Sequence, residues 1–217
     1  MPTSSKQLKC KICRRLGTKL FLKGEKCFSP KCPMIRRPYP PGKKKKRRTA
    51  MSEYNRELRE KQKLRNWYNL KETQFKNYVK DVLKKRARSG AKKGQDAPTL
   101  LIQKLEMRFD NIVFRMGFAV SRPQARQLIS HGHFLINGKK VNIPSYQLKK
   151  GEKVSIAESS RKKKIFKDLP SLLKKKNIPS WLSVDPQKLE GTVKSLPTLE
   201  EVAPPVEISM VFEFYSR

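Results

Sequence analysis

Positive charge limits how compactly this chain can fold by itself. Its 217 residues include 52 Lys and Arg against 18 Asp and Glu, which gives a formal net charge of +34. Self-repulsion on that scale opposes compaction unless an anion supplies the countercharge. A polyphosphate partner supplies it directly, so the composition favours a nucleic-acid-binding protein over a freely diffusing metabolic enzyme. The hydrophobic fraction of 36 % is enough for small cores but not for one large core.

The charge is unevenly distributed along the chain. Residues 1–50 contain 17 Lys and Arg and a single acid, Glu25, whereas residues 191–217 contain four acids and two bases. This asymmetry suggests an interaction arm followed by a protein-facing remainder. The densest basic run consists of Lys43, Lys44, Lys45, Lys46, Arg47 and Arg48. A solvated run and a nuclear-localisation signal are the alternatives, but the flanking segments are also basic, so we expect contact with RNA or DNA.

The sequence contains no signal for export or membrane insertion. Its uncharged apolar runs are only a few residues long, too short to span a bilayer. Residues 1–9 have no apolar segment of the kind that secretory signals carry. We therefore expect a reducing, cytoplasmic environment and no membrane partner.

All four cysteines fall within 23 residues, at the spacing C-x2-C-x13-C-x4-C. Two pairs of thiolates separated by a loop are how a short chain supplies the four ligands of a structural zinc ion. Two disulfides are an unfavourable alternative, because they would need an oxidising compartment. An iron–sulfur cluster uses the same four ligands and remains an alternative to zinc. We predict one structural zinc ion, with the ligands Cys10, Cys13, Cys27 and Cys32.

Residues 52–88 have the apolar spacing of helices, with a break at Asn69 and Leu70. In the second helix, Phe75, Val79 and Val82 recur at helical intervals. No acid follows Glu60 in the first helix, which favours phosphate contact over a merely solvated face. The basic residues that we assign to this contact are Arg56, Arg59, Lys61, Lys63 and Arg65.

Residues 96–166 form a predicted module of short helices followed by strands. Helices are expected at about 98–105 and 109–116, and a third begins at the capping-box sequence from Ser121 to Gln124. The second and third have the outline of a helix-turn-helix. Asn137-Gly138 predicts a type I′ hairpin between residues 134–136 and 139–141, because both central positions need positive φ. A further strand is expected at 154–156.

Basic and histidine side chains of this module could contact a nucleic-acid backbone, although a structural role for each histidine is as plausible. The candidates are Arg122 and Arg126 on the third helix, Lys139 and Lys140 on the hairpin, and His131 and His133 between them. No glycine-rich phosphate loop, carboxylate pair or triad-like set is present, so the sequence argues against an enzyme.

Three segments resemble the bacterial ribosomal small-subunit protein four family: residues 105–111, 121–133 and 136–145. Shorter matches, including the terminal residues 213–217, extend the resemblance over nearly the whole chain. The module alone would not be specific, because similar modules are appended to pseudouridine synthases and bacterial tyrosyl-tRNA synthetases. Breadth of coverage makes the resemblance specific.

The resemblance implies an α+β, mainly helical fold. It implies a zinc-binding basic arm at 1–48, a helical domain at 49–95, an RNA-binding module at 96–166 and a segment at 167–217 that packs back on the helical domain. Within that last segment, apolar and polar residues alternate from Val206 to Tyr215, which predicts a half-buried strand.

The resemblance further implies a structural constituent of the small ribosomal subunit that is a primary binder of a 16S rRNA junction in the 5′ domain. Family members initiate assembly, contribute to decoding accuracy, and lie beside small-subunit protein five where mRNA enters the subunit. An RNA-modifying enzyme and a DNA-binding regulator are the competing classes. Further RNA contacts are expected from Arg14, Arg15, Arg36, Arg37, Arg108, Arg115, Arg161 and Lys162.

Overall fold

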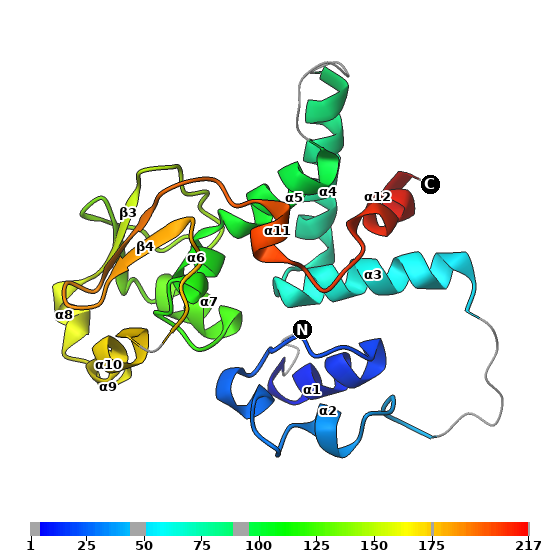
Figure 1. Cartoon of the computed structure of the whole chain (residues 1–217), viewed down its shortest axis with the longest axis horizontal. Helices are drawn as coiled ribbons and strands as arrows, with labels where there is room; N and C mark the ends of the chain where they lie inside the picture. Colours follow the sequence, from blue (N-terminus) through cyan, green and yellow to red (C-terminus); the bar gives the residue numbers. More distant parts are fainter. Residues whose placement is uncertain (1–4, 44–50, 89–95, 175, 217) are drawn as a thin grey trace. The chain divides into compact units, whose positions relative to one another are not determined.

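The structure is a computed structural model that describes residues 5–43, 51–88, 96–174 and 176–216. The chain divides into two compact units, which are described separately (Figure 1). The first unit contains Met1–Pro98 and Pro204–Arg217, and the second contains Thr99–Ala203. In the described part of the chain, no helix has both the length and the apolar character needed to cross a membrane.

The N-terminal arm of the first unit is built from short helices, drawn in blue in Figure 1. They are α1 at Ser5–Leu16, a 3-10 turn η1 at Gly24–Cys27 and α2 at Pro33–Arg36. Helix α1 ends at Leu16, and the N–H of Gly17 donates to the Cys13 carbonyl at 2.9 Å. Gly17 has a φ of 73°, the left-handed conformation that turns the chain away after a helix. Leu20 and Leu22 are buried in the loop that follows.

The predicted pair of helices in the middle of the chain is confirmed. Helix α3 covers Glu53–Trp67, and helix α4 covers Glu72–Arg88. Asn69, with a φ of 54°, makes the turn between them. Leu64 of α3 and Phe75 of α4 are fully buried, so the apolar stripes of these helices form the core of this unit.

The predicted C-terminal strand is wrong, because these residues form helix α12 at Ile208–Ser216. The same stretch contains a second periodicity: Ile208, Val211, Phe212 and Tyr215 stand at i, i+3, i+4 and i+7. Val211 has no exposed surface, although the alternating pattern would have placed it on the polar face. Burial of this residue against the unit therefore selects the helical period.

The second unit places helices against an antiparallel sheet in the order β2-β1-β3-β5-β4. Asn137 and Gly138 have φ values of 48° and 79°, which confirms the predicted hairpin turn. The elements of the second unit begin with α5 at Ala97–Glu106, whose first two residues belong to the first unit. Next come α6 at Phe109–Arg115, α7 at Arg122–Ser130, β1 at Phe134–Ile136, β2 at Lys139–Lys140 and β3 at Lys153–Ile156. They are followed by α8 at Glu158–Arg161, α9 at Lys164–Lys167, α10 at Leu169–Lys174, β4 at Leu182–Asp185, β5 at Glu190–Val193 and α11 at Leu199–Val202.

The second unit extends well beyond residue 166, because its sheet needs strands from later in the chain. Strand β5 pairs with β3, and β4 pairs with β5. The return to the first unit consequently begins at Pro204 rather than at residue 167. Strand pairing, which joins residues far apart in sequence, decides this boundary.

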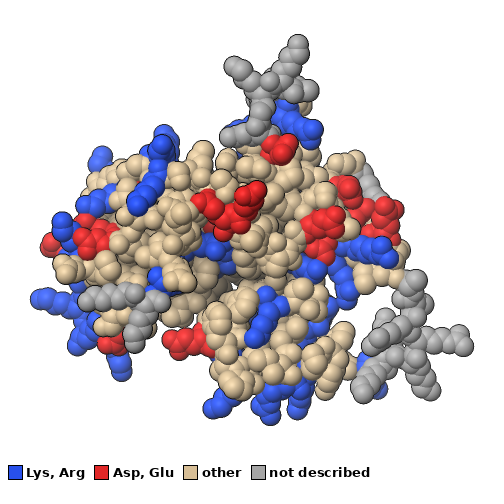
Figure 2. All heavy atoms as spheres, viewed as in Figure 1, with Lys and Arg blue, Asp and Glu red and all other residues tan. Residues whose placement is uncertain are grey.

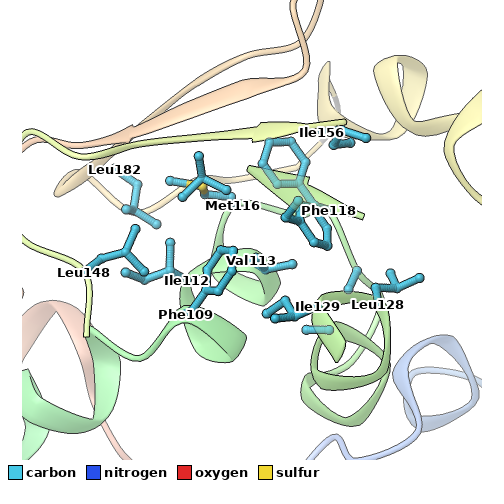
Figure 3. Packing of buried hydrophobic residues seen from close by; sticks show 14 of the residues in the cluster. Phe109, Ile112, Val113, Met116, Phe118, Leu128, Ile129, Leu148, Ile156 and Leu182 are labelled. Atoms are coloured by element: carbon cyan, nitrogen blue, oxygen red, sulfur yellow. The ribbon is translucent and has the colours of Figure 1, made fainter. Parts of the chain in front are cut away.

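Side chains of α6 and α7 point toward the sheet and form one core (Figure 3). Phe109, Ile112 and Val113 are fully buried there. Strand β5 lies so close to α6 that a β-carbon on Gly191 would stand 2.5 Å from the Met116 sulfur. Glycine at this position allows sheet and helix to approach each other.

The predicted capping box at the start of α7 does not form. Ser121 is the N-cap residue but makes no side-chain capping bond. The Gln124 side chain instead accepts a hydrogen bond from the Val120 N–H at 2.8 Å. The prediction that a helix begins here is confirmed. The predicted bond from the Ser121 N–H to the Gln124 side chain is wrong, because that side chain accepts from the N–H of the preceding residue, Val120.

Candidate nucleic-acid interface

A buried carboxylate holds the two helices of the second unit that carry predicted RNA contacts. Glu106 has no exposed surface, and its Oε1 lies 2.7 Å from Nη2 of Arg115. Its Oε2 accepts a bond from the Asn111 side chain at 2.6 Å, and the Asn111 oxygen in turn accepts from Nε of Arg122 at 2.8 Å. Glu106 and Asn111 therefore orient one arginine on α6 and one on α7.

A second buried carboxylate, Asp110, binds two more of the predicted arginines. Its Oδ2 lies 2.9 Å from Nη2 of Arg108 and 2.6 Å from Nη2 of Arg126. Arg108 is only 1 % exposed, whereas the Arg126 side chain is 29 % exposed. Arg126 can present part of its guanidinium to a ligand while staying bonded to Asp110.

These four arginines all have acidic or amide partners inside the unit, which the sequence did not predict. Contact of Arg108, Arg115, Arg122 and Arg126 with RNA stays a prediction. Glu106 and Asp110 stand four residues apart in the sequence, and Asn111 follows directly. This group of polar residues among apolar ones could have predicted a buried network, because buried polar groups need partners.

The remaining candidates of this unit differ in exposure. Lys139, Lys140, His131 and Lys162 are exposed, and Arg161 is half-buried with its Nε 3.4 Å from the Ile156 carbonyl. His133 is buried, and its Nδ1 lies 2.9 Å from the Ser160 hydroxyl. This placement favours the structural role for His133 and leaves the others available to a ligand.

Burial lowers the pKa of His133 below its usual value. The positive charges of Lys163, His131 and Lys140 lower it further. Protonation of the ring inside this basic surface is therefore unfavourable, because it adds another positive charge away from water.

In the first unit, two predicted contacts meet in a hollow of about 670 Å³ between α3, α4 and α12. Lys61 is 4 % exposed, with its Nζ 2.8 Å from Oε1 of Glu72 and 4.5 Å from the Phe214 ring centre. Arg65 binds the other carboxylate oxygen at 3.1 Å. Glu72 therefore holds both cations at the wall of the hollow.

Tyr215 completes this cluster by donating its hydroxyl to Oε1 of Glu72 at 2.7 Å. Burial raises the pKa of Tyr215, and the bond to Glu72 raises it further. Burial also acts to raise the pKa of Glu72, but the bonds from Lys61 and Tyr215 outweigh it and hold that pKa below its usual range. The sequence analysis missed Lys76 and Lys80, which also line the hollow and stand four residues apart on one face of α4.

The other predicted contacts of α3 do not line this hollow. Arg56 is exposed, and Lys63 forms an ion pair with Glu60. Arg59 reaches the Arg15 carbonyl at 3.4 Å, which connects α3 to the N-terminal arm within the first unit.

The N-terminal arm contains a second basic cavity, of about 330 Å³. Arg14 lies at its wall, with Nε bonded to the Tyr39 carbonyl at 2.9 Å and the guanidinium 4.9 Å from the Tyr39 ring centre. Arg15 and Lys43 are exposed outside the cavity lining, and Lys44 to Arg48 lie outside the described residues. The cavity is also lined by Lys11, Lys31, Arg36 and Arg37.

The four predicted zinc ligands line a common cavity of about 10 Å³, which is about the volume that a single ion or water molecule needs. All four are free thiols, and Cys13, Cys27 and Cys32 are buried. The Lys23 N–H points to the Cys27 sulfur at 3.3 Å. Within the described ranges, no group of three or more His, Cys, Asp or Glu side chains is ready to hold a metal ion as it stands.

The thiol of Cys13 favours its neutral form in this cavity. Burial raises the pKa of the Cys13 thiol; the Leu20 backbone N–H lowers it, and the other three cysteines raise it. Four thiols around one small space fit the donor set of a structural zinc ion once they are deprotonated by the metal.

The surface shown in Figure 2 carries Lys and Arg side chains on both units, with smaller acidic groups interspersed. Both units therefore have positive charge on their surface, although several of the basic side chains predicted to bind RNA form ion pairs inside their own unit. Exposed positive charge on each unit is suited to contact with the phosphates of a nucleic acid.

Comparison with known proteins identifies two matching families. Residues 5–102 match the ribosomal protein S4/S9 N-terminal domain, and residues 107–154 match the S4 domain. The chain is 47 % identical over 208 residues to small ribosomal subunit protein uS4A of Symbiobacterium thermophilum. It is 47 % identical over 209 residues to uS4 of Thermotoga maritima and 45 % identical over 209 residues to uS4 of Thermus thermophilus. Each alignment covers 96 % of this chain and 96 % of the relative.

Proposed function

Since this chain belongs to the family of small ribosomal subunit protein uS4, we propose that its two units bind 16S rRNA through their exposed basic side chains. It is a structural constituent of the small ribosomal subunit and not an enzyme, as the sequence predicted. The observation that carries this conclusion is a match to uS4 relatives over nearly the full length of the chain. An S4 domain alone would also fit a modifying enzyme.

The RNA element that we propose is a junction of helices in the 5′ domain, which the protein organises early in assembly. Support comes from exposed basic residues on both units: Lys76 and Lys80 at the hollow in the first and the hairpin at Lys139 in the second. Separate sites of this kind can neutralise phosphates of different RNA helices where they converge. Shape and unpaired elements would then select the junction, because double-stranded RNA is read mainly by shape.

On the assembled subunit, we propose contacts with small-subunit protein five and with mRNA where it enters, and through them an influence on decoding accuracy. The acidic composition of residues 191–217 supports a protein-facing surface there. Glu200 and Glu207 are exposed in this segment.

Chemical footprinting of full-length 16S rRNA tests the proposed binding. We expect protection concentrated where several helices meet in the 5′ domain, and much weaker binding to duplex DNA of equal length. Equal affinity for the two nucleic acids would instead favour a DNA-binding regulator. Protection confined to one isolated hairpin would argue against a junction.

We also propose that Cys10, Cys13, Cys27 and Cys32 hold one structural zinc ion. The support is that all four line one cavity that borders both α1 and α2. Bound there, zinc would crosslink these segments and neutralise thiolates beside a basic surface. Four thiolates would occupy all four positions of a tetrahedral zinc ion, so the proposed role is structural rather than catalytic.

Metal analysis of purified protein tests this site. We expect one zinc per chain, lost in Cys27→Ser and retained in the exposed-residue control Ile35→Ala. Stripping the zinc with a chelator should expose four reactive thiols and loosen the N-terminal arm, seen as faster proteolysis. Metal-free protein with an intact arm would reject the site, and iron with inorganic sulfide would assign it to a cluster instead.

A further inference from the structure

Two phenylalanines lie exposed on the N-terminal arm, next to the cysteine cavity. Phe21 is 38 % exposed and Phe28 is 72 % exposed. Their rings are stacked, with centres 4.9 Å apart and planes 27° apart. Phe21 also borders the cysteine cavity, which positions the inner ring. Phe28 is the outer ring and keeps most of its surface open to solvent.

The packing of the arm gives no reason for an aromatic ring at Phe28, most of which lies outside the interior. Leu20 and Leu22, on either side of Phe21, already fill the interior. Phe21 has a φ of 52°, a left-handed conformation that is unfavourable for a bulky side chain. Strained backbone of this kind is concentrated at functional sites. A glycine or asparagine would adopt this backbone conformation at a lower energetic cost. The presence of phenylalanine therefore indicates that its ring has a role.

The charge around the two rings indicates an anionic ligand. The Lys19 ammonium lies 5.8 Å from the Phe21 ring centre. Lys26 and Lys31 are exposed on either side of Phe28 in the sequence, and Glu25 is the single acid in residues 1–50. Lys31, three residues after Phe28 in the sequence, also lines the basic cavity described above.

A flat apolar surface beside lysines matches the two parts of a nucleotide. Unpaired bases stack on exposed aromatic rings while their phosphates lie on basic residues. A nucleic acid uses both features in every nucleotide, because each base has an aromatic face and each linkage a phosphate. Resting on the proposed RNA binding, we infer that the Phe21–Phe28 pair is a stacking platform for an unpaired base of the bound rRNA, with Lys19 and Lys31 beside its phosphates.

Replacing the outer ring tests this platform in the full-length protein with a full-length 16S rRNA transcript. Phe28→Leu keeps an apolar side chain but removes the stacking surface, and we expect the Kd to rise by about 5- to 100-fold. Because no phosphate contact is lost, the dependence of binding on salt should keep its slope. Phe28→Tyr should bind like the original protein. Ile35→Ala, at another exposed apolar residue of the arm, is the control and should change Kd less than twofold.

A fluorescent variant gives a second readout. In Phe28→Trp, stacking of a base on the indole should quench its emission upon rRNA binding, beyond the change seen in the original protein with Trp67 and Trp181. Unchanged Kd in Phe28→Leu together with no added quenching overturns the platform. Failure of the original protein to bind 16S rRNA would instead overturn the proposed function. Normal rRNA affinity in Phe28→Leu with impaired recruitment of other ribosomal proteins would assign the rings to a protein partner and likewise overturn the platform.

Discussion

Arginines of the same kind have different roles in this protein, and burial distinguishes them. Arg108 and Arg122 lie inside the second unit beside Asp110 and Asn111. Arg56, on helix α3 of the first unit, is exposed to solvent instead. A buried charge is retained only with partners, so the presence of Glu106 and Asp110 inside the unit accounts for the buried guanidinium groups. Residue type alone does not separate these two roles.

His133 makes the stability of the second unit dependent on pH. Its pKa is lower in the folded state than the ordinary 6.5, so the unfolded chain takes up a proton first as the pH falls. The stability from neutral His133 is complete above about pH 6.5 and is lost as the pH falls toward the folded pKa. The free energy of unfolding should therefore decrease by at most about 1.4 kcal/mol per pH unit in that window.

Urea unfolding of the wild type and two variants between pH 8 and pH 5 measures this effect. His133→Asn should lack the decrease, and His131→Asn, at the exposed histidine, should retain it. The chain has only these two histidines, so few other groups titrate in this range. A decrease that survives in His133→Asn would contradict the assignment.

At the scale of secondary structure elements, helix α12 shows how two periodicities compete. The strand pattern would place Ile208, Met210 and Phe212 on one face, and the helical pattern places Ile208, Val211 and Phe212 there. The residue that differs between them is Val211, and it is fully buried. Packing of the C-terminal residues against α3 and α4 favours a helix.

Truncation of Val211 distinguishes the two patterns experimentally. We expect Val211→Ala to lower the free energy of unfolding of the first unit by about 1–3 kcal/mol, because it leaves a cavity in a packed interior. Ser209→Ala, on the exposed face of the same helix, should change it by less than about 0.5 kcal/mol. Guanidinium unfolding followed by circular dichroism measures both. No effect of Val211→Ala would mean that this residue faces solvent, as in a strand.

For the whole molecule, charge and compactness are reconciled by distributing the basic side chains over two small units. Each unit has its own core, and each keeps some cations internally paired while others stay on the surface. The surface cations then determine how strongly binding depends on salt, because each phosphate contact releases counterions.

The salt dependence of 16S rRNA binding separates surface contacts from internal ones. Lys139→Ala should reduce the magnitude of the slope of log K against log salt by about 0.7–0.9. Arg122→Ala removes a guanidinium that is bonded to Asn111 inside the unit, and loss of that bond alone would weaken binding without changing the slope. A reduced slope for Arg122→Ala would instead support the sequence-based prediction that this arginine contacts phosphate. Filter binding across a salt series measures both variants.

Local features of this protein follow from neighbouring residues and from composition. Asn137-Gly138 specified the hairpin, apolar spacing specified α3 and α4, and the excess of Lys and Arg indicated an anionic partner. These features depend on neighbouring residues or on total charge, so they can be read without a fold. Tertiary structure decided the helix at Val211, the extension of the second unit through β4 and β5, and which arginines are internal. Each of these depends on burial against residues distant in sequence, which no local pattern contains.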